Sequence, residues 1–76
     1  MRVSTEEIRL AEDAVISEVQ ASDVPVRPID VIDVLRQRMP EDLVRFVIWQ
    51  LIDRNRIVLD RNLLLAMPER QPVFAH

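Results

Sequence analysis

Apolar residues recur at helical spacing in three stretches of the chain, and the first stretch has a clear start signal. Ser4 followed by Glu7 is a capping-box pattern, which predicts a helix from about Thr5 to Gln20. One side of this helix is expected to be buried, and the opposite side is expected to be an ordinary solvent face with a narrow strip of small or apolar residues. The expected buried side is Ile8, Ala11, Val15 and Val19, with Ile16 at the margin, and the strip is Leu10, Ala14, Ser17 and Ala21.

Prolines set the expected bounds of the second helix. Residues 21–28 contain two prolines and no helical pattern, so they should form a connection in which residues 24–27 run extended as a short edge strand. Pro28 suits the first position of a helix, and Pro40 ends it. The expected buried stripe of this second helix is Ile29, Ile32, Leu35 and Met39.

Pro40 also suits the first position of a third helix, so almost no loop is expected between the second and third helices. The third helix should end near Arg54. Asn55 then occupies the place of a left-handed cap, which glycine usually fills and asparagine fills next best. The chain contains no glycine, which makes this position informative. The expected core stripe is Val44, Val47, Ile48, Leu51 and Ile52.

The stretch RIVLDRNLLLAM, residues 56–67, predicts a hairpin with short arms. Its turn is expected at Asp60-Arg61-Asn62, with Asn62 in the left-handed conformation. Alternation along the arms should turn one set of side chains toward the helices and another set away from them. The inward set is Ile57, Leu59, Leu63 and Leu65, and the outward set is Val58 and Leu64.

The resulting expectation is an α+β, mostly helical domain over residues 1–68, followed by a flexible tail over residues 69–76. The stretch VIWQLIDRNRIVLDRNLLL, residues 47–65, resembles the recognition helix and wing of the winged helix-turn-helix family, and the resemblance extends over about residues 5–67. It implies three helices and a short two- to three-stranded antiparallel sheet, with the wing hairpin at about residues 56–67. This fold serves DNA binders, protein-docking modules and dimerisation domains alike.

The resemblance implies one candidate function, DNA binding, with the third helix in the major groove and the wing on the backbone. Asp42 and Asp53 are expected on the same outward side of that helix, where they would repel phosphates. The candidate nucleic-acid contacts are Arg38, Arg45, Gln50, Arg54 and Arg61.

The distribution of charge favours a different partner. The net charge is −3, and residues 34–76 carry seven arginines against five acids, whereas residues 1–33 carry three against eight. The second half is therefore only mildly basic, short of the strong basic patch that marks most nucleic-acid binders. The arginines are better interpreted as a solvated face on which neighbouring aspartates neutralise them than as a set of phosphate contacts.

Phe46 and Trp49 are expected to project from the third helix away from the core. Either the first helix or the tail with Phe74 covers them, or they form an exposed hot spot for a protein partner. In the second hypothesis Arg45 is a charged hydrogen-bond donor and the two aspartates form a polar rim. The candidate partner-binding residues are then Asp42, Arg45, Phe46, Trp49 and Asp53.

No combination of residues indicates catalysis. The one histidine, His76, is the last residue, and the chain has neither a cysteine nucleophile nor glycine for a phosphate-binding loop. Carboxylate pairs such as Asp30 with Asp33 fit helix starts better than a metal site. We therefore expect a protein that is not an enzyme and that has no cofactor, no metal and no small-molecule substrate.

The protein is also expected to be cytoplasmic and not to associate with a membrane. No stretch approaches the roughly 20 apolar residues of a membrane span, and the amino terminus lacks the apolar core of a signal peptide. With no cysteine, the cytosol is the default compartment. Three hypotheses for function remain. The first is a protein-interaction or oligomerisation module that binds another protein or a second copy of itself. The second is a small DNA-binding transcriptional regulator, and the third is a purely structural subdomain of a larger assembly.

Overall fold

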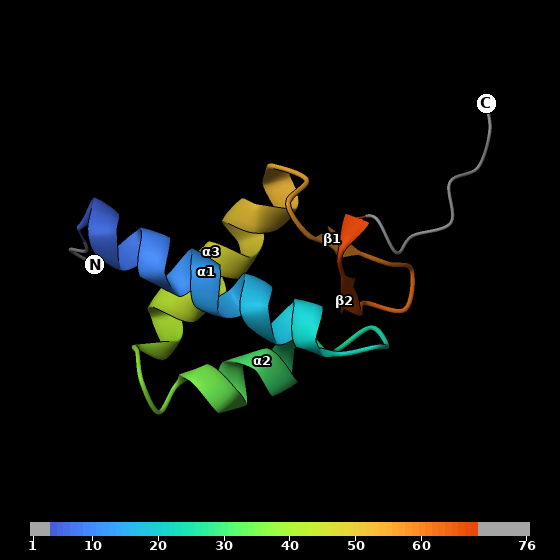
Figure 1. Cartoon of the computed structure of the whole chain (residues 1–76), viewed down its shortest axis with the longest axis horizontal. Coiled ribbons are helices and arrows are strands. Elements are labelled where there is room, and N and C mark those ends of the chain that lie inside the picture. The colour runs from blue at the N-terminus through green and yellow to red at the C-terminus, as the bar shows by residue number, and fades with distance from the viewer. Residues whose placement is uncertain (1–3, 69–76) are drawn as a thin grey trace.

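Three helices and a two-stranded antiparallel hairpin make up the computed structural model, which describes residues 4–68 (Figure 1). Helix α1 crosses α3, α2 packs against both, and the hairpin lies at one side of the helices. The α+β, mostly helical class expected from the sequence is confirmed, and the order of elements is compatible with a winged helix. The bounds are α1 (Thr5–Ala21), α2 (Pro28–Leu35), α3 (Glu41–Asp53), β1 (Val58–Leu59) and β2 (Leu65–Ala66).

Helix α1 begins where its capping box predicts. The Glu7 amide donates to Ser4 Oγ at 3.1 Å and the Ser4 amide donates to Glu7 Oε1 at 3.4 Å, so two amides at the helix start are satisfied. Leu10 is exposed as expected, but Ala14 of the same strip packs against the core. The core side of α1 is otherwise as predicted, with Ala11, Val15 and Val19 buried and Ile8 and Ile16 partly buried.

Helix α2 starts at Pro28 as predicted, but its buried side is rotated from the expected one. Val31 is buried, whereas Ile29 is 46% exposed. The expected stripe assumed that the helix continued to Met39, but the helix ends at Leu35 and Met39 packs against the core from the turn that follows. A helix of only two turns can adopt the rotation that its neighbours favour.

The connection between α2 and α3 is longer than expected. Residues 36–40 separate the two helices, and the amides of Arg38 and Met39 both donate to the Leu35 carbonyl, at 2.9 and 3.0 Å. Pro40 is the N-cap of α3 rather than its first residue. The prediction of almost no loop was therefore wrong, because the chain needs these turns to reverse direction between the two helices.

Helix α3 agrees closely with the sequence. Its predicted core residues are buried, apart from Ile52, which is partly buried, and Leu43 is buried in addition. The helix ends at Asp53 with Arg54 as C-cap. Asn55 follows with φ of 61°, so the left-handed cap predicted at this asparagine is confirmed.

The hairpin forms as predicted, but its loop differs. The strands are in register through Val58 with Ala66 and Leu59 with Leu65. Leu63, with φ of 62°, takes the left-handed conformation that was expected at Asn62. Asp60 accounts for the difference, because its side chain accepts hydrogen bonds from the Asn62 and Leu64 amides, at 2.8 and 3.0 Å. This side-chain turn moves the left-handed position one residue further on.

The orientation of the hairpin side chains is consequently only partly as expected. Ile57 and Leu65 are fully buried and Leu59 packs against the core, whereas Leu63 is 67% exposed rather than inward-facing. Val58 and Leu64, expected on the outer side, are half-buried. Of the residues expected to face the helices, Leu63 alone is exposed, because it lies in the loop.

The segment before α2 joins the hairpin at a single point. The expected edge strand over residues 24–27 is reduced to one antiparallel bridge between Val26 and Leu65. Beyond that bridge the sheet has two strands in the described residues. None of the helices in residues 4–68 is long and apolar enough to cross a membrane. The predicted tail, residues 69–76, lies outside the described residues.

Candidate functional site

The outward face of α3 exposes both of its aromatic side chains. Trp49 is 62% exposed and Phe46 is 42% exposed, one helical turn apart. The buried residues of α3 occupy the opposite side, so these two rings cannot turn into the core without rotating the helix. In the described residues α1 does not cover them, and Phe74 lies outside those residues. The exposed residues of this face are Asp42, Arg45, Phe46, Trp49 and Asp53, the set predicted from the sequence.

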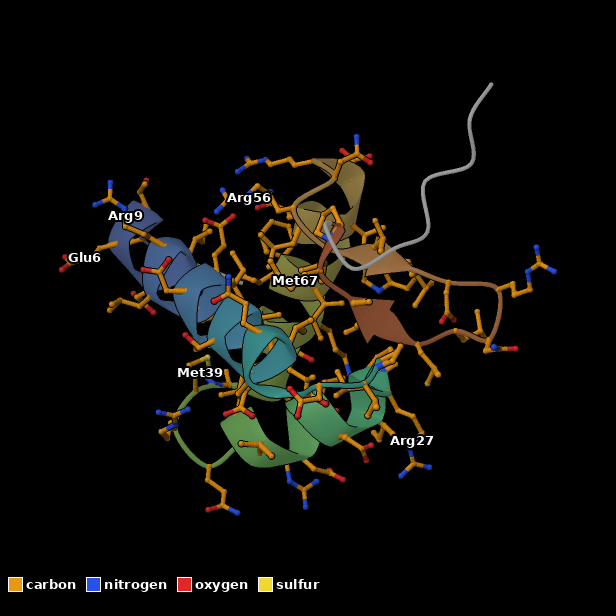
Figure 2. The ribbon with its side chains drawn as sticks, turned by 45° about the vertical axis from the view of Figure 1, so that its right-hand side comes forward. Glu6, Arg9, Arg27, Met39, Arg56 and Met67 are labelled. Carbon is orange, nitrogen blue, oxygen red and sulfur yellow. The ribbon has the colours of Figure 1, made fainter. Side chains whose placement is uncertain are left out.

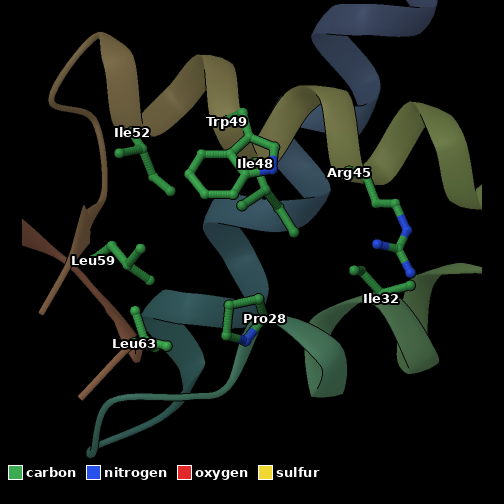
Figure 3. Close-up of a pocket in the computed structure, with 8 residues that line it drawn as sticks. All are labelled: Pro28, Ile32, Arg45, Ile48, Trp49, Ile52, Leu59 and Leu63. Atoms are coloured by element: carbon green, nitrogen blue, oxygen red, sulfur yellow. The ribbon is translucent and has the colours of Figure 1, made fainter. Parts of the chain in front are cut away.

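An apolar groove of about 220 Å³ runs along one flank of this face (Figure 3). Trp49 overhangs it from α3, and Pro28 lies across from Trp49 at the start of α2. Leu59 and Leu63 close the end next to the hairpin. The lining residues are Pro28, Ile32, Arg45, Ile48, Trp49, Ile52, Leu59 and Leu63. Three successive elements, α2, α3 and the hairpin, therefore build one apolar depression beside the aromatic residues.

Arg45 is the charged residue at the rim of this groove. Its guanidinium forms an ion pair with Glu41 one turn earlier, with Nη2 2.9 Å and Nε 3.0 Å from Oε2. Both side chains are well exposed, and an exposed pair at this spacing contributes only about 0.3–0.5 kcal/mol. Arg45 is therefore only weakly held and can exchange its partner for another carboxylate.

Gln50 is less accessible than the sequence suggested. It was expected on the outward side, but it is half-buried, and its Oε1 is shielded from solvent without a hydrogen-bond partner in residues 4–68. At 100° per residue Gln50 lies near buried Leu43 and Val47, at the edge of the core stripe. Its amide is thus turned away from the face that carries Trp49.

The other arginines considered for nucleic-acid contacts are exposed but come from separate elements. Arg38 lies in the α2–α3 connection, Arg54 at the end of α3, and Arg61 in the hairpin loop. Arg54 Nη1 lies 3.4 Å from Glu12 Oε2 of α1. The ion pairs of Arg45 and Arg54 offset part of the positive charge that a phosphate backbone would require.

A second charged pair stands at the start of α2. The Arg27 guanidinium contacts both carboxylate oxygens of Asp30, with Nε to Oδ2 at 3.0 Å and Nη2 to Oδ1 at 2.9 Å. Arg27 extends from the body of the molecule in Figure 2. Chiefly through these hydrogen bonds, the pair lowers the pKa of Asp30 and raises the pKa of Arg27. The pair lies at the entry to α2, next to Pro28, which is one wall of the groove.

Nothing in the described residues gathers into a metal site. Within residues 4–68, no group of three or more His, Cys, Asp or Glu side chains lies close enough to hold an ion.

Comparison of the chain with protein-family models, with curated proteins and with solved structures finds no match.

The exposed face of α3 was predicted from the sequence, whereas the groove was not. Helical periodicity alone places Phe46 and Trp49 away from the core. The groove depends on how α2 and the hairpin pack beside α3, and local sequence carries no signal for that. The nearest indication is Leu63, an apolar residue that directly follows the polar turn residues Asp60, Arg61 and Asn62.

Proposed function

We propose that the protein is a non-enzymatic protein-interaction module that uses the outward face of α3. The observation that carries the proposal is the exposure of Trp49, 62%, at the edge of an apolar groove. Complete burial of a large apolar side chain contributes about 1.5–3 kcal/mol of favourable free energy. A partner that covers Trp49 would therefore gain a substantial part of this free energy on binding. Tryptophan is also among the residues most enriched at the energetic centres of protein interfaces.

The rest of the face has the composition of a small interface. Phe46 adds a second aromatic anchor, and Arg45 supplies hydrogen-bond donors at the edge. Asp42 and Asp53 form a polar rim. The proposal includes no catalytic step, no cofactor and no small-molecule substrate.

We also propose that the domain is a winged helix, with α3 in the place of the recognition helix and the β1–β2 hairpin as the wing. The order of elements supports this assignment, and it makes DNA binding the second candidate function. The exposed Asp42 and Asp53 count against DNA, because they would meet phosphates at close range.

Trp49 fluorescence separates the two candidates, because Trp49 is the only tryptophan. The protein is titrated with mixed-sequence duplex DNA at low salt, where phosphate-driven binding is strongest. We expect no shift in emission. A shift that added salt abolishes steeply would overturn the proposal in favour of DNA binding.

Light scattering across a concentration series then tests the face itself. Trp49→Ala and Phe46→Ala are expected to weaken association. Val34→Ala, which trims a residue of α2 that is 48% exposed, is the matched control and should leave it unchanged. If the native chain associates, equal behaviour of all three variants would show that the α3 face is not the surface through which it does so.

A further inference from the structure

Opposite charges flank Trp49 at equal distances along α3. Arg45 lies four residues before it and Asp53 four residues after it, and all three side chains are exposed. Residues at four-residue spacing form one ridge on a helix surface. A two-fold rotation about an axis that passes through Trp49 at right angles to the helix exchanges the positions of Arg45 and Asp53. The ridge is therefore complementary in charge to an antiparallel copy of itself.

We propose, on the basis of the proposed function, that the partner of this face is a second copy of the same chain. The two α3 helices cross in antiparallel sense with Trp49 at the two-fold axis. Arg45 of each copy then pairs with Asp53 of the other copy. Ridges of this kind align when two helices cross at about −50°, the commonest packing class in globular proteins.

The charges at the ends of α3 also favour the antiparallel arrangement. Glu41 and Asp42 begin the helix, whereas Arg54 and Arg56 follow its last residue. Antiparallel packing brings the acidic start of one helix toward the arginines at the end of the other. Parallel packing would instead place Asp42 near Asp42 of the second copy, and like charges across an interface are destabilising.

The ion pairs within one chain do not prevent this exchange. The Arg45–Glu41 pair joins two side chains that are 54% and 41% exposed, so breaking it costs little. Arg54 can stay with Glu12, because the proposed pairing uses Arg45 and Asp53. The apolar contribution to the free energy of dimer formation comes from the two Trp49 rings at the axis. Offset or edge-to-face contacts between aromatic rings are favourable there. A two-fold contact uses the same patch on both copies and closes after two chains.

Charge reversal tests the pairing directly. Arg45→Asp leaves two acids on the ridge and Asp53→Arg leaves two arginines, so each single variant should repel its own copy. We expect each to weaken self-association about tenfold or more, measured by sedimentation equilibrium. An equimolar mixture of the two variants should form a heterodimer, and the double variant R45D/D53R should regain the homodimer. Arg9→Asp and Asp13→Arg on exposed positions of α1 are controls with matched charge changes, and they should dimerise as the native chain does.

The outcomes separate this inference from the proposed function. Loss of the dimer in Trp49→Ala, with both single charge variants still dimeric, would overturn the antiparallel pairing and leave the α3 face as the interaction surface. A native chain that stays monomeric throughout the concentration series would overturn the second copy as the partner. The DNA titration tests the proposed function independently of either result. Circular dichroism confirms that each variant is folded.

Discussion

Val26 and Leu65 exchange two backbone hydrogen bonds, of 2.9 and 2.6 Å, although they lie in opposite halves of the chain. Leu65 also pairs with Leu59 in the hairpin and is fully buried. Through this one residue β2 is attached both to β1 and to the segment that leads into α2.

Val26→Pro should therefore destabilise the fold. Proline removes the amide that donates to Leu65 and leaves a shielded carbonyl without its partner, at a cost of about 1–3 kcal/mol. Urea unfolding followed by circular dichroism measures the change. Val26→Thr, which keeps the amide and the extended preference, is the control and should retain most of the stability. Similar losses in both variants would show that the side chain of Val26 matters more than its hydrogen bond.

Leu63→Asn is expected to stabilise the protein. Leu63 has φ of 62°, a conformation that is unfavourable for leucine and much better tolerated by asparagine. Because Leu63 is 67% exposed, little apolar burial is lost, and we expect a gain of about 1 kcal/mol in the free energy of unfolding.

Asn55→Ala provides the converse comparison. It places alanine at φ of 61° and should cost about 1 kcal/mol. Thermal melts of both variants measure the two effects. A decrease in melting temperature for Leu63→Asn would mean that the Leu63 side chain contributes more to packing along the groove than its exposure indicates.

Ser4→Ala should cost about 1 kcal/mol, because Ser4 Oγ caps the amide of Glu7 at the start of α1. Ser17→Ala is the matched control, since Ser17 lies exposed within the same helix. Alanine has the higher helix propensity there, so the control variant should be as stable as the native chain or slightly more stable. Chemical unfolding of both variants makes the comparison, and an equal effect at the two positions would contradict a capping role.

The Arg27–Asp30 pair should make stability depend on pH in the acid range. Arg27 lowers the pKa of Asp30 in the folded protein, so ionised Asp30 stabilises the fold at neutral pH. This contribution is lost as the pH falls from the ordinary aspartate pKa through the lowered one. Asp30→Asn and Arg27→Gln should therefore be less stable than the native chain at neutral pH and should converge with it in acid. A difference that stays constant with pH would rule out ionisation of this pair as the cause.

The features that the sequence predicts well are those determined by neighbouring residues. The capping box starts α1, Pro28 starts α2, and Asn55 ends α3 where each was expected. Each of these signals acts within one helical turn. The outward position of Trp49 belongs to the same class, because helical periodicity determines it once the core stripe is known.

The features that the sequence predicts poorly depend on contacts between distant segments. Ile29 was expected inside and lies outside, because α2 is too short for its own periodicity to define one face. The left-handed position lies at Leu63 and not at Asn62, because a side-chain turn at Asp60 competes with the simplest hairpin loop. The groove beside Trp49 was not foreseen at all, since its walls meet only after α2 and the hairpin have packed.

The two left-handed positions within residues 4–68, Asn55 and Leu63, have a further consequence, because neither is glycine. Glycine gives an unfolded chain many additional backbone conformations, all of which are lost on folding. This chain contains none, so its unfolded state is restricted along its whole length. The entropy that the small core must overcome is correspondingly reduced, and the strain at Leu63 offsets only part of that advantage.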